Sequence, residues 1–84
     1  MPVPEVVLYT RRGCHLCEEA AGALRRLGGA HEFTLRTVEV DGDVGLVERY
    51  GDAVPVVTVD GVEVCRGPLD VAAVRRALFV VMSG

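Results

Sequence analysis

Hydrophobic positions in the first half of this 84-residue chain predict two strands with a helix between them. Glu5–Thr10 is a short β-branched apolar run, which is typical of a central strand covered on both faces. Residues 14–27 repeat apolar side chains at three- and four-residue steps, which predicts a helix that Gly28-Gly29 ends in the left-handed conformation. Residues 31–40 alternate apolar and polar side chains and predict a second strand. The apolar stripe expected on the helix consists of Leu16, Ala20, Ala23, Leu24 and Leu27.

The second half of the chain changes from helical to strand periodicity. A short helix is expected over Val44–Tyr50, with Asp43 as its N-cap. Two apolar strands are then expected over residues 54–59 and 62–65. Only Asp60-Gly61 separates them, and this dipeptide is the strongest short signal for a β-hairpin.

A final helix is expected over residues 69–80, opened by Gly67-Pro68. Its predicted apolar face consists of Val71, Val74, Leu78 and Val81. The predicted order is β-α-β-α-β-β-α, and the first helix implies a right-handed crossover between parallel strands. The fold class is therefore α/β: one four-stranded mixed sheet with helices on both faces, the thioredoxin-like arrangement. A single domain over residues 1–84 is expected, because separate cores need roughly 50 residues each.

Charge and composition reduce the number of function classes that fit this chain. The formal net charge of −3 argues against nucleic acid as the main partner, because phosphate binding needs a basic surface. No stretch approaches the roughly 18 to 20 apolar residues of a membrane helix, and the first residues do not form a secretory signal. A cytoplasmic monomer without a membrane partner is therefore expected.

The strongest chemical signal is the Cys14-His15-Leu16-Cys17 motif at the predicted strand-to-helix junction. Its spacing places both sulfurs on one side of the first helical turn, close enough to form a disulfide. Backbone N–H groups and the positive end of the helix dipole stabilise a thiolate at Cys14, and only a thiolate attacks a disulfide. Cys14 is the expected nucleophile and Cys17 the buried resolving thiol. Positive charge from Arg11, Arg12 and His15 is expected to lower the pKa of Cys14.

Cysteines at this spacing also occur in metal and haem sites. A Cys-x-x-Cys pair is also half of a zinc site, with His15, His31 and Cys65 as further ligand candidates, but no second pair at ligand spacing exists. A metal site is therefore not predicted. A c-type haem attachment needs a histidine where Glu18 stands, which excludes it. Cys65 fits a small buried hydrophobic residue better than a third redox-active thiol.

With these residues in hand, the chain resembles a glutaredoxin, and more narrowly the small bacterial glutaredoxin-like proteins. The resemblance covers nearly the whole chain and is carried by residues 8–17, residues 50–56 and Asp60-Gly61. Ala53-Val54-Pro55 is similar to the family's Thr-Val-Pro, whose proline is cis and faces the active-site cysteines. In the family, the backbone before this proline pairs with an extended thiol substrate. The resemblance implies this binding role for Val54 and Pro55.

The resemblance also implies two places for the carboxylates of glutathione. Glutaredoxins carry a cation three residues before the first cysteine, and Arg11 stands at that position. They hold the second carboxylate with backbone N–H groups at the start of the last helix, which here implicates Leu69 and Asp70. Pro68 replaces the second glycine of the family's Gly-Gly turn and removes one donor. Glutathione is thus a possible co-substrate, and no bound cofactor is expected.

The predicted function is a thiol–disulfide oxidoreductase whose Cys14/Cys17 dithiol reduces protein or glutathione mixed disulfides. Glutathione or a reductase would restore the dithiol. The alternative is a metal or iron–sulfur module, because glutaredoxin-like proteins can bridge a cluster between two chains with glutathione. Visible absorbance of the freshly purified protein separates these functions. The intact cysteine pair disfavours a third possibility, a redox-inactive binding domain.

Overall fold

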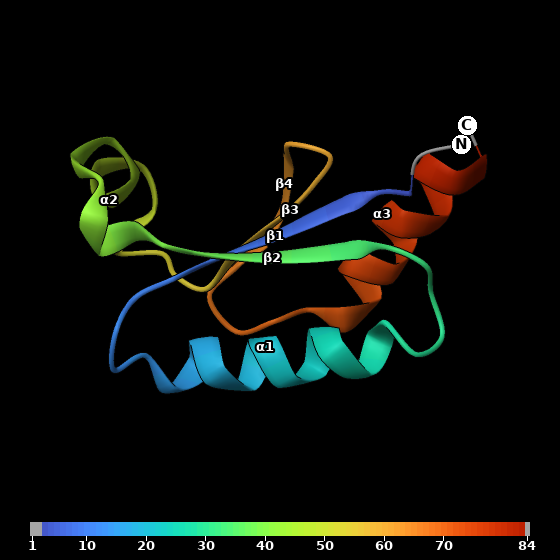
Figure 1. The fold of residues 1–84 in the computed structure, drawn as a ribbon, viewed down its shortest axis with the longest axis horizontal. Helices are drawn as coiled ribbons and strands as arrows, with labels where there is room; N and C mark the ends of the chain where they lie inside the picture. Colours follow the sequence, from blue (N-terminus) through green and yellow to red (C-terminus); the bar gives the residue numbers. More distant parts are fainter. Residues whose placement is uncertain (1–2, 84) are drawn as a thin grey trace.

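The computed structural model describes residues 3–83, with the side chains of residues 3–80, and contains a four-stranded mixed sheet (Figure 1). The strands lie in the order β2-β1-β3-β4. β1 is parallel to β2 and antiparallel to β3, and β3 forms an antiparallel hairpin with β4. The predicted thioredoxin-like sheet, with the first strand in its interior, is confirmed. The strands are β1 Glu5–Thr10, β2 Thr34–Glu39, β3 Val56–Val59 and β4 Val62–Arg66.

Helices cover both faces of the sheet, as predicted. α1 (His15–Leu27) runs beneath the strands in the view of Figure 1, and α3 (Val71–Ser83) contributes to the same hydrophobic core. α2 (Val44–Tyr50) follows a short 3-10 turn over Val40–Gly42 and lies above the left-hand end of the sheet. The sheet is therefore enclosed mainly by two long helices, and the short helix covers only one end of the opposite face.

Two hydrophobic clusters hold these layers together. In the larger cluster, the register pairs Val6 with Val59 and Leu8 with Val57, so that both strands present the same face to the long helices. The buried helical members of that cluster are Ala20, Leu24, Leu27, Val74 and Leu78. The smaller cluster consists of Val40, Tyr50 and Val56, with the ring of Tyr9 stacked 4.5 Å from that of Tyr50. It fixes α2 against the end of β1, where the cysteine motif begins.

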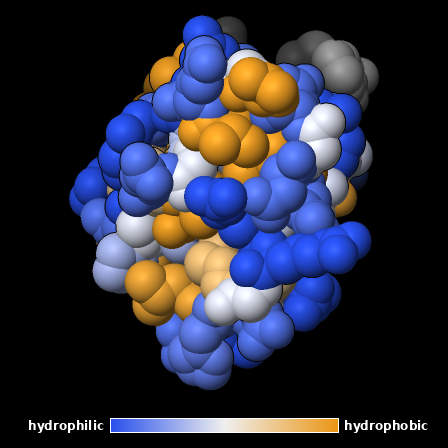
Figure 2. All heavy atoms as spheres, turned by 90° about the vertical axis from the view of Figure 1, so that its left-hand side faces the viewer, coloured by the Kyte–Doolittle hydropathy of each residue, from blue (hydrophilic) through white to orange (hydrophobic). Residues whose placement is uncertain are grey.

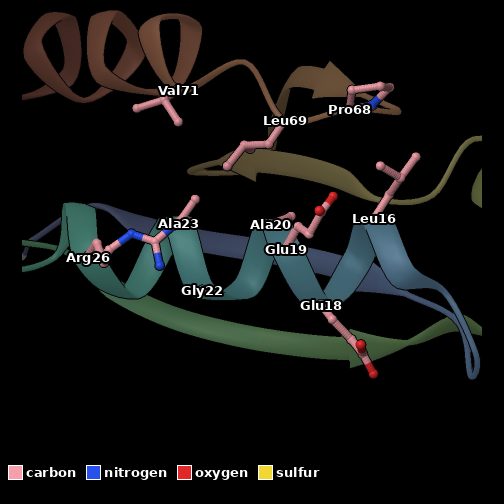
Figure 3. Close-up of a pocket in the computed structure, with 10 residues that line it drawn as sticks. All are labelled: Leu16, Glu18, Glu19, Ala20, Gly22, Ala23, Arg26, Pro68, Leu69 and Val71. Carbon is pink, nitrogen blue, oxygen red and sulfur yellow. The ribbon is translucent and has the colours of Figure 1, made fainter.

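The ends of α1 differ in two details from the sequence prediction. Gly28 is right-handed, with φ −62°, and not left-handed. The last turn tightens instead, because Gly29 N–H donates to Arg26 O and Ala30 N–H to Leu27 O. Leu16 is 41% exposed and does not join the buried stripe. Its side chain is directed toward Pro68, at the surface (Figure 3).

α3 begins at Val71, two residues later than predicted. The Asp70 carboxylate accepts a hydrogen bond from Ala73 N–H at 3.1 Å, so Asp70 caps the helix and Leu69 precedes it. Val74 and Leu78 are fully buried and Val71 is partly buried, as the predicted face requires. The side chain of Val81 lies outside the described residues.

The turns and strand ends follow the local chemistry closely. Asp60 and Gly61 both have positive φ, as the predicted hairpin requires. Asp43 accepts a hydrogen bond from Leu46 N–H and caps α2 as predicted. β3 begins at Val56, two residues later than predicted, after Pro55, which has no backbone N–H to donate to a neighbouring strand. No helix within residues 3–83 is long and apolar enough to cross a membrane.

Candidate active site

The cysteine pair lies where β1 passes into α1. Gly13 has φ +71°, a backbone conformation that glycine adopts without steric cost, and it redirects the chain after the strand. Cys14 is then the extended N-cap residue of α1, and Cys17 lies in the first turn. Their Cα atoms are 5.2 Å apart and the two side chains form a disulfide. The predicted junction and pairing are confirmed.

The two sulfurs occupy different environments. Cys14 is partly exposed, whereas Cys17 is 3% exposed and belongs to the buried residues of α1. Cys17 N–H donates to Cys14 Sγ at 3.1 Å, so the cap sulfur accepts a backbone donor at the positive end of the helix. The geometry thus gives one accessible sulfur and one protected sulfur.

Acidic residues at the end of β2 hold the two arginines that precede the pair. Arg11 Nη2 lies 2.8 Å from Asp41 Oδ1, and Arg11 Nη1 donates to Gly51 O at 3.3 Å. Arg12 Nε donates to Glu39 Oε1 at 3.0 Å, and its backbone N–H donates to Asp41 Oδ2 at 3.4 Å. The arginines therefore anchor the loop that carries Cys14, and their charges are balanced by neighbouring carboxylates.

Sequence reasoning missed Asp41 and Glu39, although a signal for them existed. β1 and β2 are parallel, so their carboxyl ends meet at one edge of the sheet. The residues after β1 are basic and those ending β2 are acidic. Opposite charges at the same edge, visible in the sequence once the strands are known to be parallel, predict these ion pairs.

His15 lies between two glutamates on the surface of α1. Its Nδ1 is 3.9 Å from Glu18 Oε2 and its Nε2 is 3.6 Å from Glu19 Oε1, with the imidazole 82% exposed. Carboxylates one turn further along the helix therefore face the side chain that was expected to bring positive charge to the cysteines.

The Val54–Pro55 segment has the expected cis peptide bond. Gly67 N–H donates to both Ala53 O (3.0 Å) and Pro55 O (2.9 Å), and this shared bond holds the turn after β4 against the proline segment. In the part of the chain that the structure describes, neither the N–H nor the C=O of Val54 has a hydrogen-bond partner.

Residues at the start of α3 serve the protein's own structure. The Asp70 side chain caps α3. Burial raises the pKa of the Cys65 thiol, with smaller contributions of the same sign from the charges of Asp70 and Glu63. Cys65 also packs against the main core. Its surroundings favour the neutral thiol, in line with the small hydrophobic role expected for it.

The surface around the pair is mixed in character. Figure 2 shows the end of the molecule with the start of α1 and with α2, where hydrophobic atoms (orange) lie among hydrophilic ones (blue). The largest exposed apolar side chains of these two helices are Leu16 and Val44. A cavity of about 240 Å³ beside the pair is lined in part by Thr10, Thr37 and both cysteines. No group of three metal-ligating side chains was found among the described residues.

Comparisons with known proteins agree with this geometry. The family model described as a glutaredoxin-like domain (DUF836) matches residues 5–79. Uncharacterized protein Rv0508 of Mycobacterium tuberculosis (strain H37Rv) and uncharacterized protein Mb0520 of Mycobacterium bovis are each 40% identical over 68 residues, which cover 75% of this chain and 70% of each relative.

Solved structures show the same architecture. Protein Ne2328 from Nitrosomonas europaea superposes with a TM-score of 0.82 at 34% identity, covering 92% of this chain and 93% of its own. Target protein XcR50 from X. campestris superposes with a TM-score of 0.70 at 36% identity, and the match covers 89% of this chain and 96% of that protein. A thioredoxin mutant from Halobacterium salinarum shares the fold, with a TM-score of 0.70 at 19% identity. The match covers 94% of this chain and 74% of the thioredoxin. The chain, with its closely spaced redox-type cysteine pair, belongs to the glutaredoxin-like (DUF836) family of the thioredoxin-like fold.

Proposed function

We propose that this chain is a thiol–disulfide oxidoreductase that reduces disulfide bonds in proteins. One observation carries the proposal. Cys14 Sγ is accessible at the start of α1 and accepts the Cys17 N–H, while Cys17 is buried one turn further on. A thiolate is stabilised where a substrate can reach it, and the second thiol is protected from competing partners.

The reaction takes two exchange steps. The Cys14 thiolate attacks one sulfur of the substrate disulfide, whose S–S bond breaks, and the other substrate sulfur leaves as a thiolate. Cys17 then loses its proton and attacks Cys14 Sγ, which releases the second substrate thiolate. The substrate gains two electrons and the enzyme disulfide forms. A thiol reductant, either glutathione or a reductase, restores the dithiol. The cavity beside Cys17, lined by Thr10 and Thr37, gives water a route to the departing proton.

The cis-proline segment serves as the platform for the substrate backbone. The unpartnered N–H and C=O of Val54 would form a short two-stranded pairing with residues next to the substrate cysteine. Such pairing uses the N–H and C=O of the substrate cysteine itself, which a protein substrate presents in an extended segment.

Protein disulfides fit the site better than glutathione does. The guanidinium of Arg11, expected to bind one glutathione carboxylate, is already engaged by Asp41. At the other expected place, the Asp70 carboxylate caps the start of α3 and Pro68 lacks a donor N–H. A glutathione anion would therefore meet two carboxylates of the protein, which supports a polypeptide as the main substrate.

The test compares turnover of insulin and of a small aliphatic disulfide, with dithiothreitol as reductant, in three proteins. Cys14→Ser is expected to lose activity by at least about 1,000-fold on both substrates, because it removes the nucleophile. Cys65→Ser is the matched control and is expected to keep the wild-type rate. Full activity in Cys14→Ser would refute the proposal.

A further inference from the structure

A groove runs along α1 away from the cysteine pair (Figure 3). α1 forms one wall, and the segment from Pro68 to Val71 forms the other. The groove has a cavity volume of about 520 Å³ and begins at Leu16, inside the cysteine motif. It shares Ala23, Arg26 and Val71 with a second cavity of about 460 Å³ toward the far end of α1, so the two are continuous.

The floor of the groove is apolar and its two ends carry opposite charge. Small and aliphatic side chains from both walls form the floor, among them Ala20, Ala23 and Leu69. Glu18 and Glu19 both line the end nearest the cysteine motif, and in Figure 3 the Glu19 side chain points toward the Pro68–Val71 wall while that of Glu18 points away from it.

The far end of the groove is basic, with Arg26, His31 and Arg75 in its lining. None of these three side chains has an ion-pair partner among the described residues, and Glu19 has only the exposed His15, at 3.6 Å. The groove therefore presents an acidic and then a basic position with charges open to a ligand.

The spacing of these charges matches an extended polypeptide. Glu19 and Arg26 are seven residues apart in a helix, which is about 10 Å along its axis. An extended chain covers that distance in about three residues. The Arg26 side chain reaches back along the helix, since its Nη1 lies 3.5 Å from where a Cβ atom of Gly22 would stand.

We propose that this groove binds the substrate polypeptide beyond its disulfide cysteine. It selects a segment with a basic side chain near the cysteine and an acidic one about three residues further away. This inference rests on the proposed function and adds the substrate class to it. The basic side chain meets Glu19, the acidic one meets Arg26 with Arg75 beside it, and apolar residues between them cover the floor.

The test uses peptides of identical composition whose single cysteine is linked to thionitrobenzoate, so that chromophore release reports the attack by Cys14. One pair of peptides places Lys near the cysteine and Glu three residues further, and the other pair exchanges Lys and Glu. Each pair is made in two versions, one with the cysteine at the N-terminus of the peptide and one with it at the C-terminus. Both are needed because the groove does not fix the direction in which the peptide chain runs. The reduced wild type is expected to prefer the Lys-near peptide about fivefold in at least one direction, the scale of two exposed charge pairs.

Two charge reversals separate the groove from general charge effects. Arg26→Glu is expected to abolish or invert the preference. Arg25→Glu makes the same change one residue away, outside the groove lining, and is expected to keep it. Equal rates for the exchanged peptides in the wild type would overturn the inference, as would equal effects of the two variants. If inorganic sulfate slows both peptides equally, the basic end is a simple anion site and the inference also fails. If the wild type reduces the small aliphatic disulfide but does not distinguish the peptides by charge, only this inference is refuted. If it reduces neither the aliphatic disulfide nor the peptides, the proposed function is refuted.

Discussion

Cys14 and Cys65 are two thiols in similar backbone settings with opposite chemistry. Cys14 Sγ accepts the backbone N–H of Cys17 at the start of α1. The pKa of Cys65 is raised mainly by burial, and the backbone N–H of Asp70, just before α3, offsets only part of that rise. Cys14 is the N-cap residue of α1 and is partly exposed, beside arginines whose charges are balanced by Glu39 and Asp41. Cys65 packs into the core beside the carboxylates of Asp70 and Glu63. A backbone donor alone therefore does not make a thiol reactive; desolvation and neighbouring charge decide.

The largest expected difference between the two thiols is their rate of alkylation. At pH 7, iodoacetamide is expected to modify Cys14 at least about tenfold faster than Cys65, since each unit of pKa separation changes the thiolate fraction tenfold. Mass spectrometry of reduced single-cysteine variants measures both rates. Equal rates in the folded protein would break the comparison, and equal rates in urea provide the control.

The two thiols are also expected to give opposite pH dependences of stability. The raised pKa of Cys65 contributes stability that is fully present below the pKa of the unfolded thiol and is lost as pH rises through the folded value. A lowered pKa at Cys14 would act in the reverse sense: its contribution is present above the unfolded pKa and lost as pH falls through the folded value.

Urea unfolding of the reduced protein between pH 7 and 10 measures both effects. Cys65→Ser is expected to flatten the loss of stability toward high pH, whereas Cys14→Ser is expected to steepen it. Identical pH profiles for the two variants would show that their surroundings do not differ as described.

The smallest effect concerns Asp41, which balances the charge of Arg11 beside Cys14. Asp41→Asn is expected to lower the alkylation midpoint of Cys14 by about 0.3 pH unit, the scale of one exposed charge pair, and to leave Cys65 unchanged. Asp52→Asn removes the same charge at an exposed position and serves as the control. An equal shift in both variants would mean that only net charge matters.

Much of this fold follows from local sequence signals. The Asp60-Gly61 turn, the Asp43 cap and the apolar periods of the strands each act over a few residues, and the structure bears them out. The element ends that differ depend on a hydrogen bond or a neighbour that periodicity does not contain. Asp70 moves the start of α3, and the tightened last turn of α1 keeps Gly28 right-handed.

The parts of the site formed by residues close together in the sequence were predictable, and those formed by residues far apart in the sequence were missed. Cys14 and Cys17 depend only on spacing and on a helix start, and the structure pairs them as expected. The partner of Arg11 lies 30 residues away along the chain, so only the parallel pairing of β1 and β2 brings Asp41 to it. Such a contact requires the topology first and then the charges at each edge of the sheet.

Trapping the covalent intermediate tests the central claim most directly. Reduced Cys17→Ser protein, incubated with a disulfide-containing protein such as insulin, is expected to accumulate a mixed disulfide. Peptide mapping is expected to place that bond on Cys14, because the thiol that would resolve it is missing. Absence of an adduct, or an adduct on Cys65, would contradict the assignment of Cys14 as nucleophile and Cys17 as resolving thiol.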